Sequence, residues 1–320
     1  MKNVLITGVS GQDGIFLTSK LLEENKFNIF GVTRSNHKYV FKKINSLQKN
    51  GLERIKLINT NLENSQDVNK LILDTKPDIV FNLTGPSSVY DSFKDNNLSK
   101  DLMIKIFDNI SSACINLNNF PNFFQASSSE MYGTNKNKKL DENDYFMPNS
   151  PYAEGKYEIH KKIMNLNKEY GFNIKSGIMF NHESEFRTDD YLFMKIINFA
   201  LNQKRPNKKL EIGSLEYIRD WSFAGDLTNA IFDITVYGKD SVYCIGSGEG
   251  NTIRDLLIIV FEYFNLDYKE FVLENKNLLR ANDPVERISN PKKLVSELNW
   301  KPNLNFEELV IRCIEKKFIN

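Results

Sequence analysis

The sequence predicts an α/β protein built on a buried parallel sheet, and residues 2–34 are the strongest reason. An apolar run at Val4–Ile6 is followed by glycines at 8, 11 and 14, by apolar residues at helical spacing, and by a second apolar run at Phe27–Val32. Strand, glycine turn, helix and strand make a βαβ unit. Ile55–Ile58 and Asp78–Leu83 read as further strands, and the second is largely apolar, as a buried parallel strand should be.

The glycine turn predicts a dinucleotide site. A strand that turns sharply into a helix, with a phosphate close to its backbone, leaves no room for a Cβ, and the helix N-terminus offers free N–H groups to a pyrophosphate. A tight turn without a ligand is the alternative. The second strand ends at Thr33-Arg34-Ser35, without an acidic residue to bind a ribose 2′-hydroxyl. Arg34 therefore favours NADP, with NAD as the alternative, unless it is only a solvated loop cation.

The rest of the chain continues the alternation of strands and helices. Residues 36–52 are polar and basic and predict a loop or short helix near the adenosine end of a cofactor. Residues 98–118 predict a helix with one apolar face, and Phe123–Ser127 predicts a fifth strand. Ile174–Phe180 predicts another strand. Near the C-terminus, Asn290-Pro291 reads as the N-cap and first residue of a helix, and a final amphipathic helix follows.

Polar residues after the fifth strand predict hydride chemistry, because open α/β sheets carry their sites at strand ends. Ser128 follows that strand, and Pro148–Pro151 starts a helix on which Tyr152 and Lys156 lie four residues apart on one face. A free tyrosine titrates near pH ~10, and a nearby lysine together with an oxidised nicotinamide lowers that pKa. The phenolate then takes a proton from a sugar hydroxyl that Ser128 orients. A chance surface pair of tyrosine and lysine is the alternative.

Several strings resemble one family. The turn Thr7–Gly14 has the G-x-x-G-x-x-G spacing of the extended short-chain dehydrogenase/reductase superfamily, and its Gly-Gln-Asp-Gly is typical of the GDP-mannose 4,6-dehydratase family. Ser128–Glu130 resembles the Thr-Ser-Glu of that family, and Asn181–Ser184 resembles its Asn-His-Glu-Ser. Arg219–Trp221 resembles its Arg-Asp-Trp, and Arg280 and Asp283 stand at its Arg-Pro-x-Glu position.

The resemblance covers nearly the whole chain and implies a doubly wound parallel sheet (Rossmann) of about seven strands, with a smaller C-terminal substrate-binding lobe. Residues 1–180 are then mainly an NADP-binding Rossmann domain, and residues 181–320 mainly a nucleotide-sugar-binding lobe interleaved with the last Rossmann elements. A homodimer or homotetramer is also implied. Departures from the family at Asn61, Pro86 and Glu185-Phe186 lie near the expected cofactor or diphosphate.

The activity implied by the resemblance is that of an NADP-dependent nucleotide-sugar 4,6-dehydratase, a hydro-lyase of deoxysugar biosynthesis that converts GDP-mannose to GDP-4-keto-6-deoxymannose. Glu130 decides the subclass, because epimerases and reductases of the superfamily commonly have a small or apolar residue there. Once C4 is a ketone, a carboxylate removes the C5 proton and assists loss of the C6 hydroxyl, and the hydride returns to C6.

Several alternatives remain open on the sequence. One alternative is that Glu130 only pairs with a nearby cation, and decarboxylating relatives also carry glutamate at this position. GDP-heptose is the alternative substrate, for a 4,6-dehydratase or for a 4-dehydrogenase that stops at the ketone. Another nucleotide-sugar epimerase or reductase is a further alternative, and a non-catalytic NADP-binding regulator is the remote one.

The resemblance also assigns residues to roles. The catalytic residues are Ser128, Glu130, Tyr152 and Lys156. The cofactor-binding residues are Gly8, Gly11, Gln12, Asp13, Gly14, Arg34, Asn61, Leu62, Leu83, Thr84, Gly85, Tyr152, Lys156 and His182. The substrate-binding residues are Ser87, Asn181, Arg187, Arg219, Arg280 and Asp283. An arginine fork suits a diphosphate.

Composition argues against other classes of protein. Hydrophobic residues make up 41% and charged residues 26% of the chain, which is ordinary for a soluble globular protein. The net charge of +1 provides no field that would attract nucleic acid or a membrane. No apolar run approaches the ~20 residues of a membrane helix, and no signal peptide is visible. The three cysteines lack metal-site spacing and suit a reducing cytoplasm.

Overall fold

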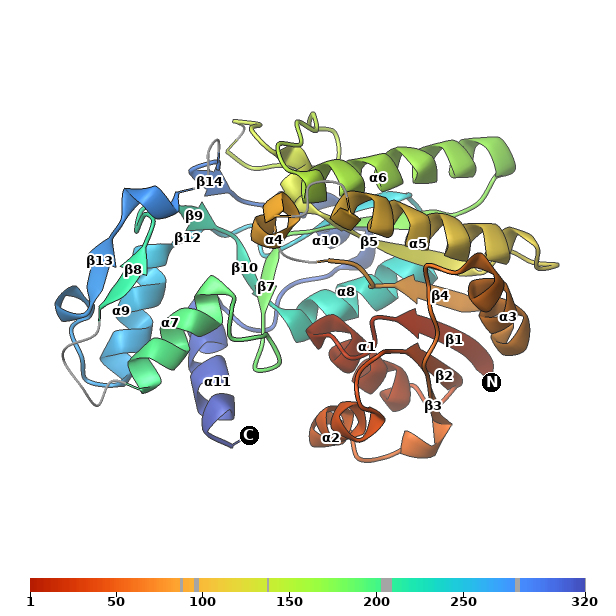
Figure 1. Ribbon diagram of the computed structural model, residues 1–320, viewed down its shortest axis with the longest axis horizontal. Coiled ribbons are helices and arrows are strands. Elements are labelled where there is room, and N and C mark those ends of the chain that lie inside the picture. The colour runs from red at the N-terminus through yellow and green to blue at the C-terminus, as the bar shows by residue number, and fades with distance from the viewer. Residues whose placement is uncertain (87–88, 95–97, 137, 203–208, 280–282, 320) are drawn as a thin grey trace.

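A central sheet of seven parallel strands organises the molecule (Figure 1). The computed structural model describes residues 1–86, 89–94, 98–136, 138–202, 209–279 and 283–319. The strand order is β11-β6-β5-β4-β1-β2-β3, which confirms the predicted doubly wound sheet. The strands are β1 Lys2–Thr7, β2 Phe27–Val32, β3 Ile55–Ile58, β4 Ile79–Asn82, β5 Asn122–Ser128, β6 Ile174–Met179 and β11 Val242–Ile245.

Helices cover both faces of the sheet. One layer contains α1 Gln12–Glu23, α2 His37–Leu47 and α8 Ala224–Tyr237, and the other contains α3 Ser65–Thr75, α5 Leu98–Ile115 and α6 Pro151–Tyr170 (Figure 1). Strand β1 shows why two layers are needed: Val4 and Ile6 pack into the cluster that includes α1, while Leu5 packs into the cluster that includes α3. Because successive side chains of a strand point to opposite faces, a continuous apolar strand requires cover on both.

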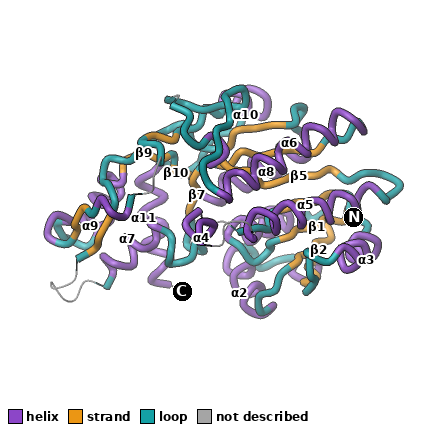
Figure 2. The backbone as a smooth tube through the Cα atoms, turned by 45° about the horizontal axis from the view of Figure 1, so that its top comes forward, coloured by secondary structure: helices purple, strands orange, loops and turns teal. Residues whose placement is uncertain are grey.

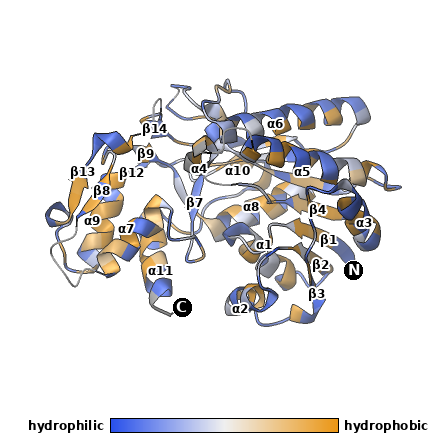
Figure 3. Ribbon diagram, viewed as in Figure 1, coloured by the Kyte–Doolittle hydropathy of each residue, from blue (hydrophilic) through white to orange (hydrophobic). Residues whose placement is uncertain are grey.

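A smaller lobe lies to one side of the sheet (Figure 2). Its helices are α7 Leu192–Leu201, α9 Ile253–Tyr263 and α11 Phe306–Ile319, which are rich in hydrophobic residues (Figure 3), and α9 packs against the other two. The parallel pair β8 Leu210–Ile212 and β13 Val272–Glu274 completes this lobe. The chain then returns to the large sheet, because α10 Lys292–Leu298 packs against α8 and β11.

Short strands connect the lobe with the sheet. The parallel pair β7 Asn181–Glu183 and β10 Trp221–Phe223 is one connection. The other is β9 Ile218–Arg219, which pairs with β12 Asn251–Thr252 and β14 Glu286–Arg287. The remaining helices are α4 Val89–Lys94 and the 3-10 helices η1 Leu52–Arg54, η2 Ser129–Tyr132, η3 Tyr268–Glu270 and η4 Lys276–Leu278.

The strand order reverses between β1 and β4, and such a point is where open α/β sheets bind ligands. Gly8 follows β1 with φ +74, and a Cβ on it would lie 3.0 Å from the carbonyl carbon of Leu83 at the end of β4. A Cβ on Gly14 would lie 2.5 Å from the Cα of Val9. The first glycine therefore permits the turn, and the third permits α1 to pack closely on it.

Several strands differ from their expected bounds by one or two residues, and two helix boundaries also differ. The helix expected over residues 98–118 ends at Ile115. The helix expected to begin at Pro291 begins at Lys292, with Pro291 as its N-cap. The reason is that Asn290 is bonded elsewhere: its N–H donates to the Leu140 carbonyl and its side chain donates to Asp141. In the described part of the chain, no helix is both long enough and apolar enough to cross a membrane.

Candidate active site

Strand β5 and helix α6 bring three of the expected catalytic residues together. Helix α6 begins after Ser150, whose hydroxyl accepts a hydrogen bond of 3.2 Å from the N–H of Ala153. This start places Tyr152 against Ser128 at the end of β5, and the two side chains are hydrogen-bonded. Lys156 lies one turn further along α6, and its Nζ donates to the Ala126 carbonyl oxygen over 2.7 Å.

Burial dominates the protonation of this group. It raises the pKa of Tyr152 above its ordinary value, and the hydrogen bond with Ser128 offsets only part of that rise. Burial also lowers the pKa of Lys156 to about 8, against the opposing effect of Asp13. The lowered tyrosine pKa expected with Lys156 and a bound nicotinamide is therefore not found in the protein alone. The Nζ of Lys156 is held at the Ala126 carbonyl, 5.6 Å from the centre of the tyrosine ring.

Glu130 lies on η2, the short turn that follows β5. Its backbone N–H donates to the Ser128 hydroxyl over 3.2 Å, which fixes the start of the turn. Its carboxylate lines the cavity beside Tyr152 and also forms an ion pair of 2.5 Å with Arg287. The cation pairing considered from sequence is thus present, and Glu130 lines the cavity as well. Sequence reasoning did not identify Arg287 as the partner.

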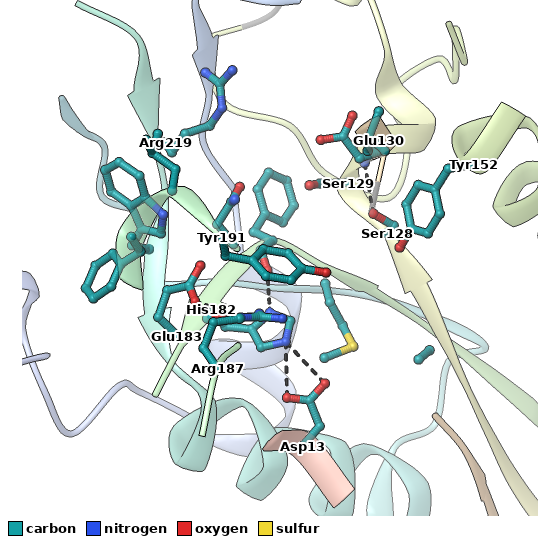
Figure 4. A pocket seen from close by; sticks show the side chains of 18 of the residues that line it. Asp13, Ser128, Ser129, Glu130, Tyr152, His182, Glu183, Arg187, Tyr191 and Arg219 are labelled. Atoms are coloured by element: carbon teal, nitrogen blue, oxygen red, sulfur yellow. Dashed lines mark hydrogen bonds and ion pairs between the residues drawn. The ribbon is translucent and has the colours of Figure 1, made fainter. Parts of the chain in front are cut away.

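A cavity of about 450 Å³ is lined by most of the residues expected to act in catalysis and to bind substrate. Figure 4 shows Ser128, Glu130 and Tyr152 close together, with His182 and Asp13 joined lower in the view. The cavity is lined by all four expected catalytic residues and by Asn181, His182, Arg187, Arg219 and Asp283. The expected substrate residues Ser87 and Arg280 lie outside the described residues. Tyr191, which sequence reasoning missed, also lines the cavity, and no motif marks it.

A second cavity, of about 490 Å³, follows the glycine turn. It is lined by most of the expected cofactor residues, namely Gly8, Gly11, Gln12, Asp13, Arg34, Asn61, Leu62, Leu83, Thr84 and Gly85. Gly14 is not among them, because it is buried beneath the turn. The remaining three, Tyr152, Lys156 and His182, line the first cavity.

The second cavity fits a dinucleotide. The hydroxyl of Thr84 is buried in it without a hydrogen-bond partner in the described part of the chain, so a bound polar ligand would satisfy it. Gly11 is the N-cap of α1 and offers no side-chain cap, so the helix N-terminus faces the cavity bare. Arg34 is exposed at the rim and forms no ion pair with another described residue.

The two cavities are adjacent, because both are lined by Asp13, Leu83, Gly85, Pro86 and Arg187. The Nε2 of His182 lies 3.2 Å from the Asp13 carboxylate, and its Nδ1 donates to the Phe180 carbonyl over 2.7 Å. Burial acts to lower the pKa of His182, but Asp13 outweighs it, so the pKa is raised. Burial likewise acts to raise the pKa of Asp13, but His182 and Arg187 outweigh it, so the pKa is lowered.

Charged residues of the C-terminal half also line the first cavity, with Arg219 and Asp283 away from the second cavity and Arg187 next to it. Arg219 forms an ion pair of 3.1 Å with Asp283, and each side chain is about 10% exposed. Arg187 donates to Glu183 over 2.7 Å, and its guanidinium lies 4.4 Å from the ring centre of Tyr191. Arginine in this setting presents donors in a fixed fork, which suits a diphosphate.

Comparisons with known proteins point to one family. A family model described as GDP-mannose 4,6 dehydratase matches residues 5–313. GDP-mannose 4,6 dehydratase 2 of Arabidopsis thaliana is 30% identical, covering 98% of this chain and 86% of the relative. The human GDP-mannose 4,6 dehydratase is 29% identical, covering 96% and 88%.

Solved structures share the fold. The dTDP-glucose 4,6-dehydratase of Bacillus anthracis in complex with NAD superposes with a TM-score of 0.81 at 18% identity, covering 100% of this chain and 97% of its own. The UDP-glucose 4-epimerase of Thermus thermophilus in complex with NAD gives 0.84 at 20% identity, covering 99% of each chain.

Proposed function

This chain belongs to the GDP-mannose 4,6-dehydratase family, and on that basis we propose that it removes water from a GDP-sugar, GDP-mannose first, to leave a 4-keto-6-deoxy sugar. One observation carries the proposal: a carboxylate, Glu130, lies in the same cavity as Ser128, Tyr152 and Lys156. The last three suffice for the proton transfer in C4 oxidation once a hydride acceptor is bound. The carboxylate is what an elimination across C5 and C6 adds to that requirement.

The chain's own residues supply the proton transfers. Ser128 holds the C4 oxygen, and Tyr152 takes the proton of the C4 hydroxyl as C4 becomes a ketone. The ketone makes the C5 proton acidic, and Glu130 removes it and passes it to the C6 oxygen as the C6–O bond breaks, so that water leaves. When hydride then adds to C6, a proton from solvent restores the C5–H bond. A bound nicotinamide dinucleotide supplies the hydride acceptor at C4 and the hydride donor at C6. The sugar is thus oxidised at C4 and reduced at C6, with no outside reductant.

The dinucleotide is held by the second cavity, and we propose NADP in preference to NAD. The glycine turn and the N-terminus of α1 receive the pyrophosphate, and Thr84 offers its unpartnered hydroxyl. The preference rests on Arg34, which follows β2 and lines this cavity. Its neighbours in sequence, Thr33 and Ser35, are not acidic, so no carboxylate is placed there to bind a ribose 2′-hydroxyl. The two solved structures named above were determined with NAD, so this preference needs its own measurement.

The nucleotide end of the substrate is assigned to the part of the first cavity that Arg219 and Asp283 line. Arg219 suits the diphosphate, and Asp283 suits a ribose hydroxyl pair. GDP-heptose is the alternative substrate, and a 4-dehydrogenase that stops at the ketone is the alternative reaction. We also propose that the protein forms a homodimer or homotetramer, and this rests on the family resemblance alone. Light scattering measures the molar mass of the assembly directly.

Mass spectrometry after incubation with a panel of sugar nucleotides tests the proposed function. Loss of one water supports a dehydratase, whereas loss of two hydrogens identifies a 4-dehydrogenase. No change with any sugar nucleotide would favour the non-catalytic regulator. Glu130→Gln is the informative variant, because C4 oxidation does not need this base. We expect it to slow water loss by ~10²–10⁴ and to accumulate a 4-keto sugar that keeps its C6 oxygen. Water loss at the wild-type rate would remove Glu130 from the chemistry.

A further inference from the structure

Arg287 is the most deeply buried cation beside the proposed site. Its side chain is 1% exposed and does not line either cavity. It belongs to β14, which pairs with β9, and its carbonyl accepts the N–H of Asp220 over 3.1 Å. Asp220 in turn accepts from the backbone and hydroxyl of Ser289, two residues after Arg287. The position of this arginine is therefore fixed by strands of the C-terminal half.

The guanidinium of Arg287 holds both ends of the turn that carries Glu130. Its Nη1 lies 2.5 Å from Oε1 of Glu130, at the start of η2. Its Nη2 donates to the carbonyl of Gly133, just past the end of that turn, over 3.2 Å. Gly133 has φ +52, and a Cβ on it would lie 1.7 Å from the Met147 carbonyl oxygen. The turn is thus held between Arg287 on one side and the 147–148 backbone on the other.

We propose that Arg287 is a positioning residue for Glu130, which keeps the carboxylate ionised and fixed at the cavity wall for proton removal at C5. Within the described part of the chain, neither Nε nor Nη1 of Arg287 makes an aligned hydrogen bond. The negative charge on Glu130 is therefore what compensates the buried guanidinium. A protonated Glu130 would leave that cation uncompensated, so the pair favours the basic form of the carboxylate.

This inference rests on the proposed function, and it separates two steps of that function. Oxidation at C4 relies on Ser128, Tyr152 and Lys156, none of which contacts Arg287 among the interactions described above. Elimination relies on Glu130, which contacts it directly. Loss of the Arg287 charge should therefore change the partition between the two steps, whereas a general loss of packing would slow both.

The experiment compares Arg287→Met, Arg287→Lys and the control Lys175→Met with the wild type. Lys175 is also 1% exposed, but it bonds the Gly238 and Asp240 carbonyls and lines neither cavity. Each full-length protein is incubated with cofactor and the GDP-sugar that the wild type dehydrates, in deuterated water. Mass spectrometry then measures 4-keto sugar that keeps its C6 oxygen, product that has lost water, and deuterium at C5.

For Arg287→Met we expect the ratio of water loss to C4 oxidation to fall roughly 10- to 100-fold, as for a displaced catalytic group. The dissociation constant of the GDP-sugar should stay within about twofold, because Arg287 lies outside the cavity. Lysine keeps the charge but loses the fork, so Arg287→Lys should give an intermediate ratio. Lys175→Met should keep the wild-type ratio.

Three results would overturn the inference: a wild-type ratio in folded Arg287→Met, an equal loss of both steps in it, or the same fall in Lys175→Met. Where Arg287→Met does not fold, Arg287→Lys decides, and a wild-type ratio there counts against the inference. A wild type that loses no water from any GDP-sugar refutes the proposed function, and the inference with it. A dehydrating wild type with an unchanged ratio in the variants refutes the inference alone.

Discussion

At the scale of single residues, the site is controlled by burial as much as by charge. Tyr152 has a raised pKa in the protein alone, and Lys156 a lowered one of about 8. The lysine alone therefore does not lower the pKa of the Tyr152 hydroxyl enough to form the phenolate. An oxidised nicotinamide carries such a charge, so we expect base catalysis by Tyr152 to begin only when the cofactor is bound.

Tyr152→Phe should abolish oxidation at C4 and leave the dissociation constant of the cofactor within about threefold, because only the proton acceptor is removed. A general base contributes a factor of ~10²–10⁴, which sets the expected loss. Cofactor reduction in a single turnover measures it. Tyr157→Phe is the matched control: it makes the same change on the same helix, and Tyr157 lines neither cavity. Substantial turnover by Tyr152→Phe would exclude Tyr152 as the base.

Arg34→Ala should weaken NADP binding by about tenfold or more and leave NAD binding unchanged, because a hydrogen bond to a charged group is worth ~1.5–3 kcal/mol. Calorimetry with each dinucleotide measures both. Lys38→Ala is the control, since Lys38 is an exposed cation nearby that does not line the cavity. Tighter binding of NAD than of NADP by the wild type would contradict the role given to Arg34.

Asp13→Asn should bring the pKa of His182 below the ordinary 6.5, because burial then acts without the carboxylate that raises it. NMR titration of the ring protons measures this, with Asp74→Asn at an exposed acid as control. A His182 pKa that stays raised in Asp13→Asn would mean that Asp13 is not its cause.

The ion pair of His182 and Asp13 also makes the free energy of unfolding depend on pH. The raised pKa of His182 stabilises the fold fully below pH 6.5, and that part is lost as pH rises through the folded-state pKa. The lowered pKa of Asp13 stabilises it above pH 3.8, and that part is lost as pH falls through the folded-state pKa. The free energy of unfolding should therefore differ most between wild type and Asp13→Asn from about pH 4 to 6.5.

At the scale of elements, the glycine turn must let α1 pack closely and must leave room for a phosphate. Substitutions at two different glycines can separate these requirements. A Cβ on Gly14 meets the Val9 backbone at 2.5 Å, so the requirement there is packing of α1. A Cβ on Gly11 meets only the Gly8 carbonyl, at 3.4 Å, and Gly11 has an ordinary φ of −72. Gly11 lines the second cavity, so the requirement there is room for a phosphate.

Gly14→Ala should lower the free energy of unfolding by about 1–3 kcal/mol, as overpacking does, whereas Gly11→Ala should leave it within about 0.5 kcal/mol. Cofactor affinity should fall at least tenfold in Gly11→Ala, because a Cβ added to a residue of the cavity wall takes up room that the phosphate needs. Urea unfolding and calorimetry on the two variants distinguish the effects, and each serves as the other's control. A stable Gly14→Ala, or a Gly11→Ala that binds cofactor normally, would contradict this division.

At the scale of the whole molecule, what sequence could predict was local. Apolar runs and turn residues lie next to one another in the chain, so six strands of the large sheet and the start of α6 were predictable to within a residue or two, whereas β11 was not predicted. Contacts across the fold were not. His182 meets Asp13 across 169 residues, and Arg287 reaches Gly133 across 154. Arginines are mostly exposed, so nothing in the sequence around Arg287 signalled a buried ion pair.

The division into residues 1–180 and 181–320 remains a prediction about which half binds which ligand. A fragment of residues 1–180 should not fold, because the edge partner of β6 is β11, and α8, which covers one face of the sheet, also lies beyond it. Circular dichroism and chemical-shift dispersion of the fragment test this, with the full chain as control. A monomeric, cooperatively unfolding fragment that binds NADP would show the N-terminal half to be autonomous.

The strand order also has a consequence for synthesis on the ribosome. Six strands of the sheet are made by residue 179, yet the seventh, β11, ends at Ile245. Until that strand emerges, the β6 edge and the apolar face awaiting α8 stay exposed to the surrounding solution. At ~5–20 residues per second this interval lasts several seconds, long enough for chaperones or neighbouring nascent chains to bind. The nascent chain is therefore most prone to aggregate at mid-length, and the second half of the gene completes the sheet that the first half begins.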